Sequence, residues 1–107
     1  MTVDSIAEAF QTKLRVAILA VLYGGERDFN TLKDTLKTTD GNLSIQLSRL
    51  EEWGYITSRR ETKGKKRTVY AATAFGKAMF RDYVDMLSVH IAETDDGKES
   101  DTEKTKG

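Results

Sequence analysis

The sequence predicts a mainly α-helical domain with one small β-hairpin, and three observations support this fold class. Apolar residues recur every four positions across residues 5–23, which is the spacing of a buried helical face. Leu43, Leu47 and Leu50 repeat in a similar way behind a threonine that can cap a helix. A basic segment then folds back around a glycine-containing turn and leads into a long apolar helical pattern.

The first two helices are expected near the N-terminus. The first covers residues 5–23, and its apolar side chains occupy more than one face, as in a helix that is central or pairs with another chain. A glycine pair ends it. Residues 26–29 are extended at best. A short second helix follows over residues 31–36, with Asn30 or Thr31 as its N-cap.

The third helix is expected over residues 40–53, with Thr39 as its N-cap and Gly54 as its left-handed end. At about 100° per residue, its leucines share one side and small or polar residues collect on the other. Asn, Gln and Arg bond base edges in the major groove, and an aliphatic side chain contacts the thymine methyl. The alternative is a solvated helix face. The candidate DNA-contacting residues here are Thr39, Gly41, Asn42, Ser44, Ile45, Gln46 and Arg49.

The hairpin is expected from strands at residues 55–62 and 67–72, joined by a turn at 63–66. Six basic residues and one acid lie between Tyr55 and Tyr70, a local charge of +5. Cations that meet DNA phosphates release counterions and give affinity that depends little on sequence. The alternative is an ordinary solvated turn. The candidate phosphate-contacting residues are Arg59, Lys63, Lys65, Lys66 and Arg67.

The last helix is expected from its N-cap Thr73 to about Ala92, and it has more apolar positions than one small domain readily covers. These side chains either complete the domain core or pair with a second copy across a two-fold axis. Two reading helices about one DNA turn apart fit a pseudo-palindromic duplex site. We therefore expect a homodimer, with the candidate interface residues Ile6, Phe10, Phe80, Tyr83, Val84, Leu87 and Ile91.

The order of these elements is that of a winged helix-turn-helix with a long C-terminal helix for dimerisation. The 107 residues suffice for one domain. We assign residues 1–92 to a winged-helix DNA-binding and dimerisation domain. Residues 93–107 form an acidic tail that is too poor in apolar side chains to fold alone, so disorder is expected there. The zero net charge of the chain combines +3 over residues 1–92 with −3 over the tail.

Several function classes are excluded by what the sequence lacks. It has no cysteine, and the single histidine, His90, cannot build a zinc site unaided, so no metal is expected. Without a paired acid motif or a glycine-rich phosphate loop, neither enzyme activity nor a cofactor is expected. The absence of a signal peptide and of a long apolar stretch predicts a cytoplasmic protein with no membrane partner.

Three stretches between about Phe10 and Ile91 resemble the single-domain winged-helix regulators related to the MarR and ArsR groups. Residues 13–19 are similar to the first core helix of these regulators, and residues 73–77 to the threonine-capped start of the last helix. The most specific stretch is Thr-Asp-Gly-Asn-Leu-Ser at residues 39–44, continuing to Ile56. The resemblance implies a homodimer in which Gly41, Asn42, Ser44, Ile45, Gln46 and Arg49 face DNA and wing cations meet flanking phosphates.

The chain departs from these relatives in four places. It has Ile45 and Gln46 where relatives often carry a basic residue and then an aromatic or polar one, which affects base preference and not docking. The proline that usually follows the threonine of the last helix is absent. The cysteine pair of metal-sensing relatives is absent too, so metal sensing is not implied. The chain is also too short for the extra helices that form a ligand pocket in MarR proteins.

The sequence thus predicts a homodimeric, sequence-specific DNA-binding transcription regulator that acts as a repressor. Its recognition helix, about residues 39–53, would lie in the major groove, and its wing, about residues 62–67, on flanking phosphates. The alternative is a winged helix used as a protein–protein interaction module without specific DNA binding. The operator and any effector are unknown.

Overall fold

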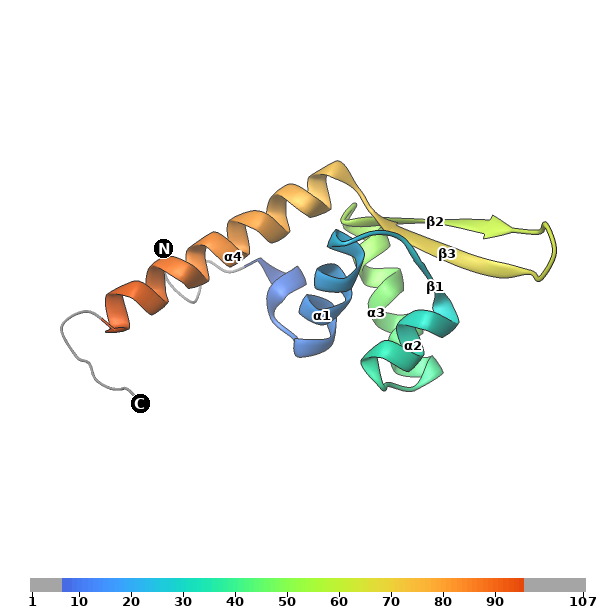
Figure 1. Cartoon of the computed structure of the whole chain (residues 1–107), viewed down its shortest axis with the longest axis horizontal. Coiled ribbons are helices and arrows are strands. Elements are labelled where there is room, and N and C mark those ends of the chain that lie inside the picture. Colours follow the sequence, from blue (N-terminus) through green and yellow to red (C-terminus); the bar gives the residue numbers. More distant parts are fainter. Residues whose placement is uncertain (1–6, 96–107) are drawn as a thin grey trace.

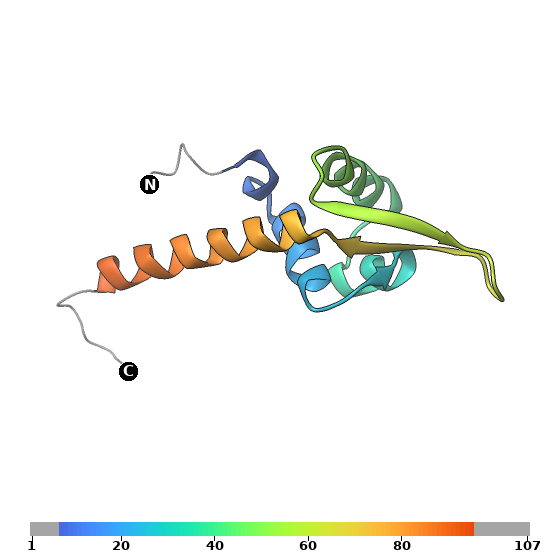
Figure 2. The ribbon, with the colours of Figure 1, turned by 90° about the horizontal axis from the view of Figure 1, so that it is seen from above.

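Three helices and a small sheet form the body of the protein, and a long helix extends away from it (Figure 1). The computed structural model describes residues 7–95 of the chain. The β2–β3 hairpin and α4 point in opposite directions from the central helices (Figures 1 and 2). In chain order the elements are η2 (Glu8–Phe10), α1 (Lys13–Tyr23), β1 (Arg27–Asp28), α2 (Phe29–Leu36), α3 (Asp40–Glu52), β2 (Ile56–Glu61), β3 (Arg67–Ala72) and α4 (Ala74–Asp95). This order confirms the predicted fold class.

The N-terminal helix is shorter than predicted. Instead of one helix over residues 5–23, a 3-10 turn precedes α1, and Thr12 separates the two in an extended conformation. The Thr12 hydroxyl accepts a hydrogen bond from the amide of Arg15 at 3.3 Å. The cause is local, because a threonine that caps the next helix cannot also continue the preceding one. Ser5, the predicted start, lies outside the described residues.

The segment before α2 contains a strand that the sequence did not clearly predict. Arg27 and Asp28 form β1, which pairs antiparallel with β3, so the sheet has three strands in the order β1-β3-β2. Asp28 is also the N-cap of α2 and accepts from the amide of Thr31 at 2.8 Å. Asn30 and Thr31 were the wrong caps, since α2 already begins at Phe29.

The core lies where α1 contacts α2, α3, α4 and β3. The leucine face of α3 is buried as predicted, and it packs on apolar residues of α1 and α2. Burial of each such side chain contributes about 1.5–3 kcal/mol to the free energy of unfolding. The largest fully buried side chains are Ile18, Leu19, Leu22, Leu32, Leu43, Leu47, Leu50 and Ile56.

The start of α4 is fixed against the end of α3. The Thr73 hydroxyl donates to the carbonyl of Gly54 at 2.7 Å and accepts from the amide of Gly76 at 2.9 Å. A Cβ on Gly76 would lie 2.0 Å from the carbonyl oxygen of Tyr55. The helix therefore crosses the Tyr55 backbone at a distance that only glycine allows. It then continues to Asp95, beyond the predicted end near residue 92.

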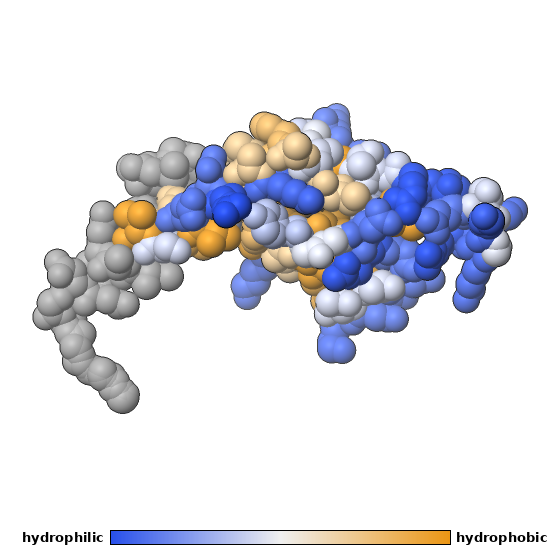
Figure 3. Space-filling view, turned by 45° about the horizontal axis from the view of Figure 1, so that its top comes forward, coloured by the Kyte–Doolittle hydropathy of each residue, from blue (hydrophilic) through white to orange (hydrophobic). Residues whose placement is uncertain are grey.

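Polar and apolar residues are segregated along the molecule. In Figure 3 hydrophilic residues cover the hairpin end, and hydrophobic residues gather toward the α4 end. Across residues 7–95, no helix has the length and apolar character needed to cross a membrane.

Candidate nucleic-acid interface

The outward side of α3 stands clear of the rest of the subunit. Thr39 caps this helix as predicted, with its hydroxyl 3.2 Å from the amide nitrogen of Asn42. A salt bridge of 2.8 Å between Lys33 on α2 and Asp40 links the first turn of α3 to α2. The predicted contact residues that are exposed on this helix are Thr39, Gly41, Asn42, Ser44, Ile45 and Arg49.

Ile45 is the apolar residue on this face, and 53% of its surface is exposed. Around it lie only small and polar residues, including Ser48 and Arg49. Gly41 leaves open space around its backbone, because nothing within 4 Å would meet a Cβ there. The arrangement offers an aliphatic contact, hydrogen-bonding groups and an accessible backbone on one helical face, which is suited to the edges of bases and to phosphates.

Gln46 differs from its neighbours because it is half-buried. Its side-chain oxygen accepts a hydrogen bond of 2.8 Å from Arg15 on α1. Arg15 is 6% exposed, and its guanidinium carbon lies 5.3 Å from the centre of the Trp53 ring. Arg15 is not among the residues predicted to form the site. Arg15 lies on the same face of α1 as the buried residues Ile18, Leu19 and Leu22, which follow it by three, four and seven positions. This spacing in the sequence could have identified Arg15 as a buried cation.

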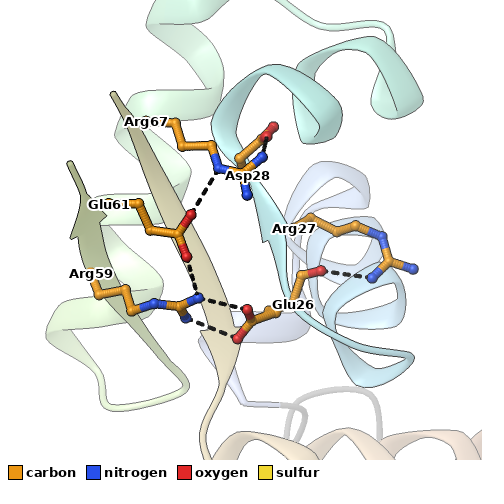
Figure 4. A network of polar contacts seen from close by, with 6 residues as sticks. All are labelled: Glu26, Arg27, Asp28, Arg59, Glu61 and Arg67. Carbon is orange, nitrogen blue, oxygen red and sulfur yellow. Dashed lines mark hydrogen bonds and ion pairs between the residues drawn. The ribbon is translucent and has the colours of Figure 1, made fainter. Parts of the chain in front are cut away.

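The hairpin carries its cations in two groups. Lys63, Lys65 and Lys66 at the tip are exposed, and none of them forms an ion pair with the side chains of residues 7–89, which are those the structure describes. Arg59 and Arg67, further down the strands, are held by acids instead (Figure 4). In the described part of the chain, the tip lysines therefore extend into solvent with uncompensated charge, as does the exposed Arg60 on β2, which the predicted contact residues omitted.

One acid comes from the hairpin, one from β1 and one from the residue just before β1. Arg59 contacts both carboxylate oxygens of Glu26, at 2.7 and 2.9 Å, and one oxygen of Glu61 at 2.7 Å. Arg67 contacts Glu61 at 3.0 Å and Asp28 at 3.1 Å (Figure 4). We call these five residues the wing ion-pair network. A count of charges along the hairpin includes Glu61 but misses Asp28 in β1 and Glu26 just before it, which the β1–β3 pairing brings close to the hairpin.

This network stays ionised at neutral pH. Hydrogen bonds from Arg59 lower the pKa of Glu26, and those from Arg59 and Arg67 lower the pKa of Glu61. Hydrogen bonds from the backbone amide and side chain of Thr31 lower the pKa of Asp28, and the charge and hydrogen bond of Arg67 lower it further. Two of the predicted phosphate-contacting residues, Arg59 and Arg67, are therefore already partnered in the free protein.

The predicted dimer residues lie in different environments. Val84 and Leu87 are exposed on α4, together with Val89, which the prediction omitted. Phe80 and Tyr83 are half-buried, and the Tyr83 ring stacks on Phe10 with ring centres 4.6 Å apart. Phe10 is 6% exposed and belongs to the subunit core, so little of it is available to a second chain. Ile6 and the side chain of Ile91 lie outside the described part of the structure.

Comparisons with known proteins identify the same fold and family. A family model described as a winged helix DNA-binding domain matches residues 14–91. An uncharacterised protein of Methanocaldococcus jannaschii is 42% identical over 77 residues, covering 70% of this chain and 84% of that protein. A transcriptional regulator homologue from Pyrococcus horikoshii OT3 aligns with a TM-score of 0.74 and 25% identity, over 77% of this chain and 83% of that one. HlyU from Vibrio cholerae shares the fold, with a TM-score of 0.64 and 23% identity over 76% and 86% of the two chains.

The family match extends from α1 into α4 and includes α3 and the hairpin. It therefore covers both α3 and the hairpin, where the sequence predicts contacts with DNA. The role it assigns is binding and not catalysis. The chain belongs to the winged helix DNA-binding domain family, and DNA is its partner.

Proposed function

We propose that this protein is a sequence-specific transcription regulator that binds DNA as a homodimer and represses by occluding a promoter. In this proposal α3 enters the major groove and the lysines of the hairpin tip meet flanking phosphates. The observation that carries the proposal is the outward side of α3, where Asn42, Ile45 and Arg49 are exposed in the subunit. An apolar side chain on such a face gains from contact with a thymine methyl.

The proposed homodimer rests on α4. This helix extends beyond the body of the domain (Figure 1), and Val84 and Leu87 are 41% and 38% exposed on it. Pairing two copies of α4 would remove this apolar surface from water. A two-fold axis would also set two copies of α3 against half-sites of a pseudo-palindromic duplex.

Fluorescence anisotropy with labelled duplex DNA tests the proposal. The protein should bind random-sequence duplex with an affinity that falls steeply as salt is raised, and should bind a duplex selected from a random pool more tightly. If it bound no duplex at about 0.15 M salt, the regulator proposal would be wrong. That result would favour a winged helix that binds another protein through the same face.

Substitution of Glu61 by glutamine should strengthen binding to all DNA sequences. Glu61 contacts both Arg59 and Arg67, so without its charge Arg59 keeps only Glu26 and Arg67 only Asp28, and one of the two can exchange that single partner for a phosphate. One added phosphate contact steepens the slope of log K against log salt by about 0.9. Anisotropy titrations at several salt concentrations measure this slope. Asp85→Asn makes the same charge change on the exposed side of α4, away from the hairpin, and should leave the slope unchanged.

Leu87→Glu should weaken the homodimer. It places a charge in the proposed interface, where removal of that charge from water is unfavourable, so the dimer dissociation constant should rise by about 10-fold or more. Sedimentation equilibrium measures the constant. Thr57→Glu introduces the same charge on the exposed side of β2 and serves as the control. A wild-type chain that remains monomeric at all concentrations would contradict the dimer.

A further inference from the structure

Arg15 is a buried cation without an acidic partner. Its side chain donates to the carbonyl oxygen of Glu8 at 3.0 Å and to the side-chain oxygen of Gln46 at 2.8 Å. Among the residues that the structure describes, no carboxylate lies within ion-pair distance of it, and its Nε has no hydrogen-bond partner. The remaining contact of the guanidinium is with the ring of Trp53, over which it lies. Burial of a charge without a carboxylate partner is unfavourable, and an aliphatic side chain would fill the same space at lower cost.

The contact with Gln46 determines which group this glutamine presents. A guanidinium has only donors, so the carboxamide oxygen of Gln46 must face Arg15. The amino group of the carboxamide is then directed away from Arg15. Trp53, whose ring lies beside the guanidinium, limits the space into which Arg15 could move. Gln46 is therefore held as a hydrogen-bond donor toward its remaining surroundings.

Gln46 lies on the edge of α3 that also carries Asn42 and Arg49, four residues before and three residues after it. Residues at these spacings share one side of a helix, and both neighbours are exposed. If α3 enters the major groove, the amino group of Gln46 approaches the same base edges as these two side chains. A glutamine that is free to rotate bonds adenine through both its oxygen and its nitrogen, whereas guanine offers two acceptors, N7 and O6.

We propose that Arg15 is a positioning residue for DNA specificity: it holds the Gln46 oxygen, so that Gln46 donates to guanine and does not pair with adenine through both its atoms. The inference rests on the proposed function and deepens it. It assigns a role in base selection to a residue that is buried on another helix and does not touch DNA.

Binding-site selection from a random duplex pool tests the inference, with the wild type, Gln46→Ala and Arg15→Met compared. Gln46→Ala should relax the preference at one base pair of each half-site, where the wild type selects guanine. Arg15→Met removes the donors and keeps an unbranched apolar stem. It should shift that same position toward adenine by about 2- to 10-fold, the value of one hydrogen bond, and leave the other positions unchanged.

The outcomes separate the inference from the proposed function. If the wild type enriches no sequence, the proposed function itself fails. If the wild type enriches a site and Gln46→Ala changes no position, or Arg15→Met leaves the ratio of guanine to adenine unchanged, only the inference is overturned. A purely structural role of Arg15 would lower affinity for all sequences equally and would not move one position.

A second measurement needs no DNA, and its main comparison is between the wild type and Gln46→Glu. Gln46→Glu gives the buried guanidinium a carboxylate partner, so the thermal unfolding midpoint should rise by about 4 °C or more. A lower midpoint would show that Arg15 does not hold this side chain. Where Arg15→Met folds, Gln46→Glu should fail to raise the midpoint in its background, because the cation is then absent.

Discussion

Among the glycines that the structure describes, substitution of Gly76 by alanine should destabilise the protein the most. The new Cβ would lie 2.0 Å from the carbonyl oxygen and 2.8 Å from the carbonyl carbon of Tyr55. These are backbone atoms, so no side-chain rotation relieves the contact, and α4 must move away from the end of α3. That movement breaks the hydrogen bonds of Thr73 to this backbone. We expect the free energy of unfolding to fall by about 3 kcal/mol.

Gly41→Ala is the matched control for this prediction. It also adds one methyl group to a helical glycine, but nothing within 4 Å meets the new Cβ. Alanine is the better helix former, so the free energy of unfolding should rise by about 0.5–1 kcal/mol. Urea denaturation followed by circular dichroism measures both variants. Equal stability of the two would contradict the close packing of α4 on Tyr55.

Arg49→Ala should weaken binding to the selected DNA site by about 1–3 kcal/mol, which is the contribution of one good base contact. The side chain is exposed on the outward side of α3, and in the described structure its guanidinium forms no hydrogen bond or ion pair. The substitution therefore removes no contact within the subunit. We expect the unfolding midpoint to stay the same and the base preference at the contacted position to relax.

Lys65→Ala distinguishes a base contact from a phosphate contact. Lys65 is exposed at the hairpin tip, so its loss should weaken specific and random duplex alike and reduce the salt slope by about one unit. Arg49→Ala should instead reduce the difference in affinity between the specific duplex and the random duplex. Anisotropy titrations of both variants on both duplexes provide the comparison. If both variants bound the selected duplex like the wild type, the docking of α3 and the wing would be wrong.

The elements with strong local signals were predicted closely. The Thr39 cap, the leucine side of α3 and the left-handed Gly54, with a φ of 84°, all depend on residues a few positions apart. The two segments that were predicted less well, around Thr12 and at β1, also have local causes. At Thr12 the four-residue apolar repeat continues through a cap, and the capping hydroxyl prevailed over the repeat. In β1 two residues are too few to show a period.

The charge of the wing could not be predicted from nearby residues. Glu26 lies 33 positions before Arg59 in the chain, yet their side chains share two hydrogen bonds. The pairing of β1 with β3 creates this proximity. A count of charges along the hairpin therefore overestimates the cations available to DNA, since Arg59 and Arg67 already have carboxylate partners.

The sequence by itself determined the order of the helices, the buried side of α3 and the outward position of Asn42, Ile45 and Arg49, because helical periodicity and caps act over a few residues. Only the tertiary structure decided which polar groups remain available for contacts with a partner and which are already held within the subunit. Arg15 holds the oxygen of Gln46 across 31 positions of the chain. Hydrogen bonds and ion pairs form wherever folding brings partners within about 3 Å, and that proximity depends on packing and not on distance along the chain.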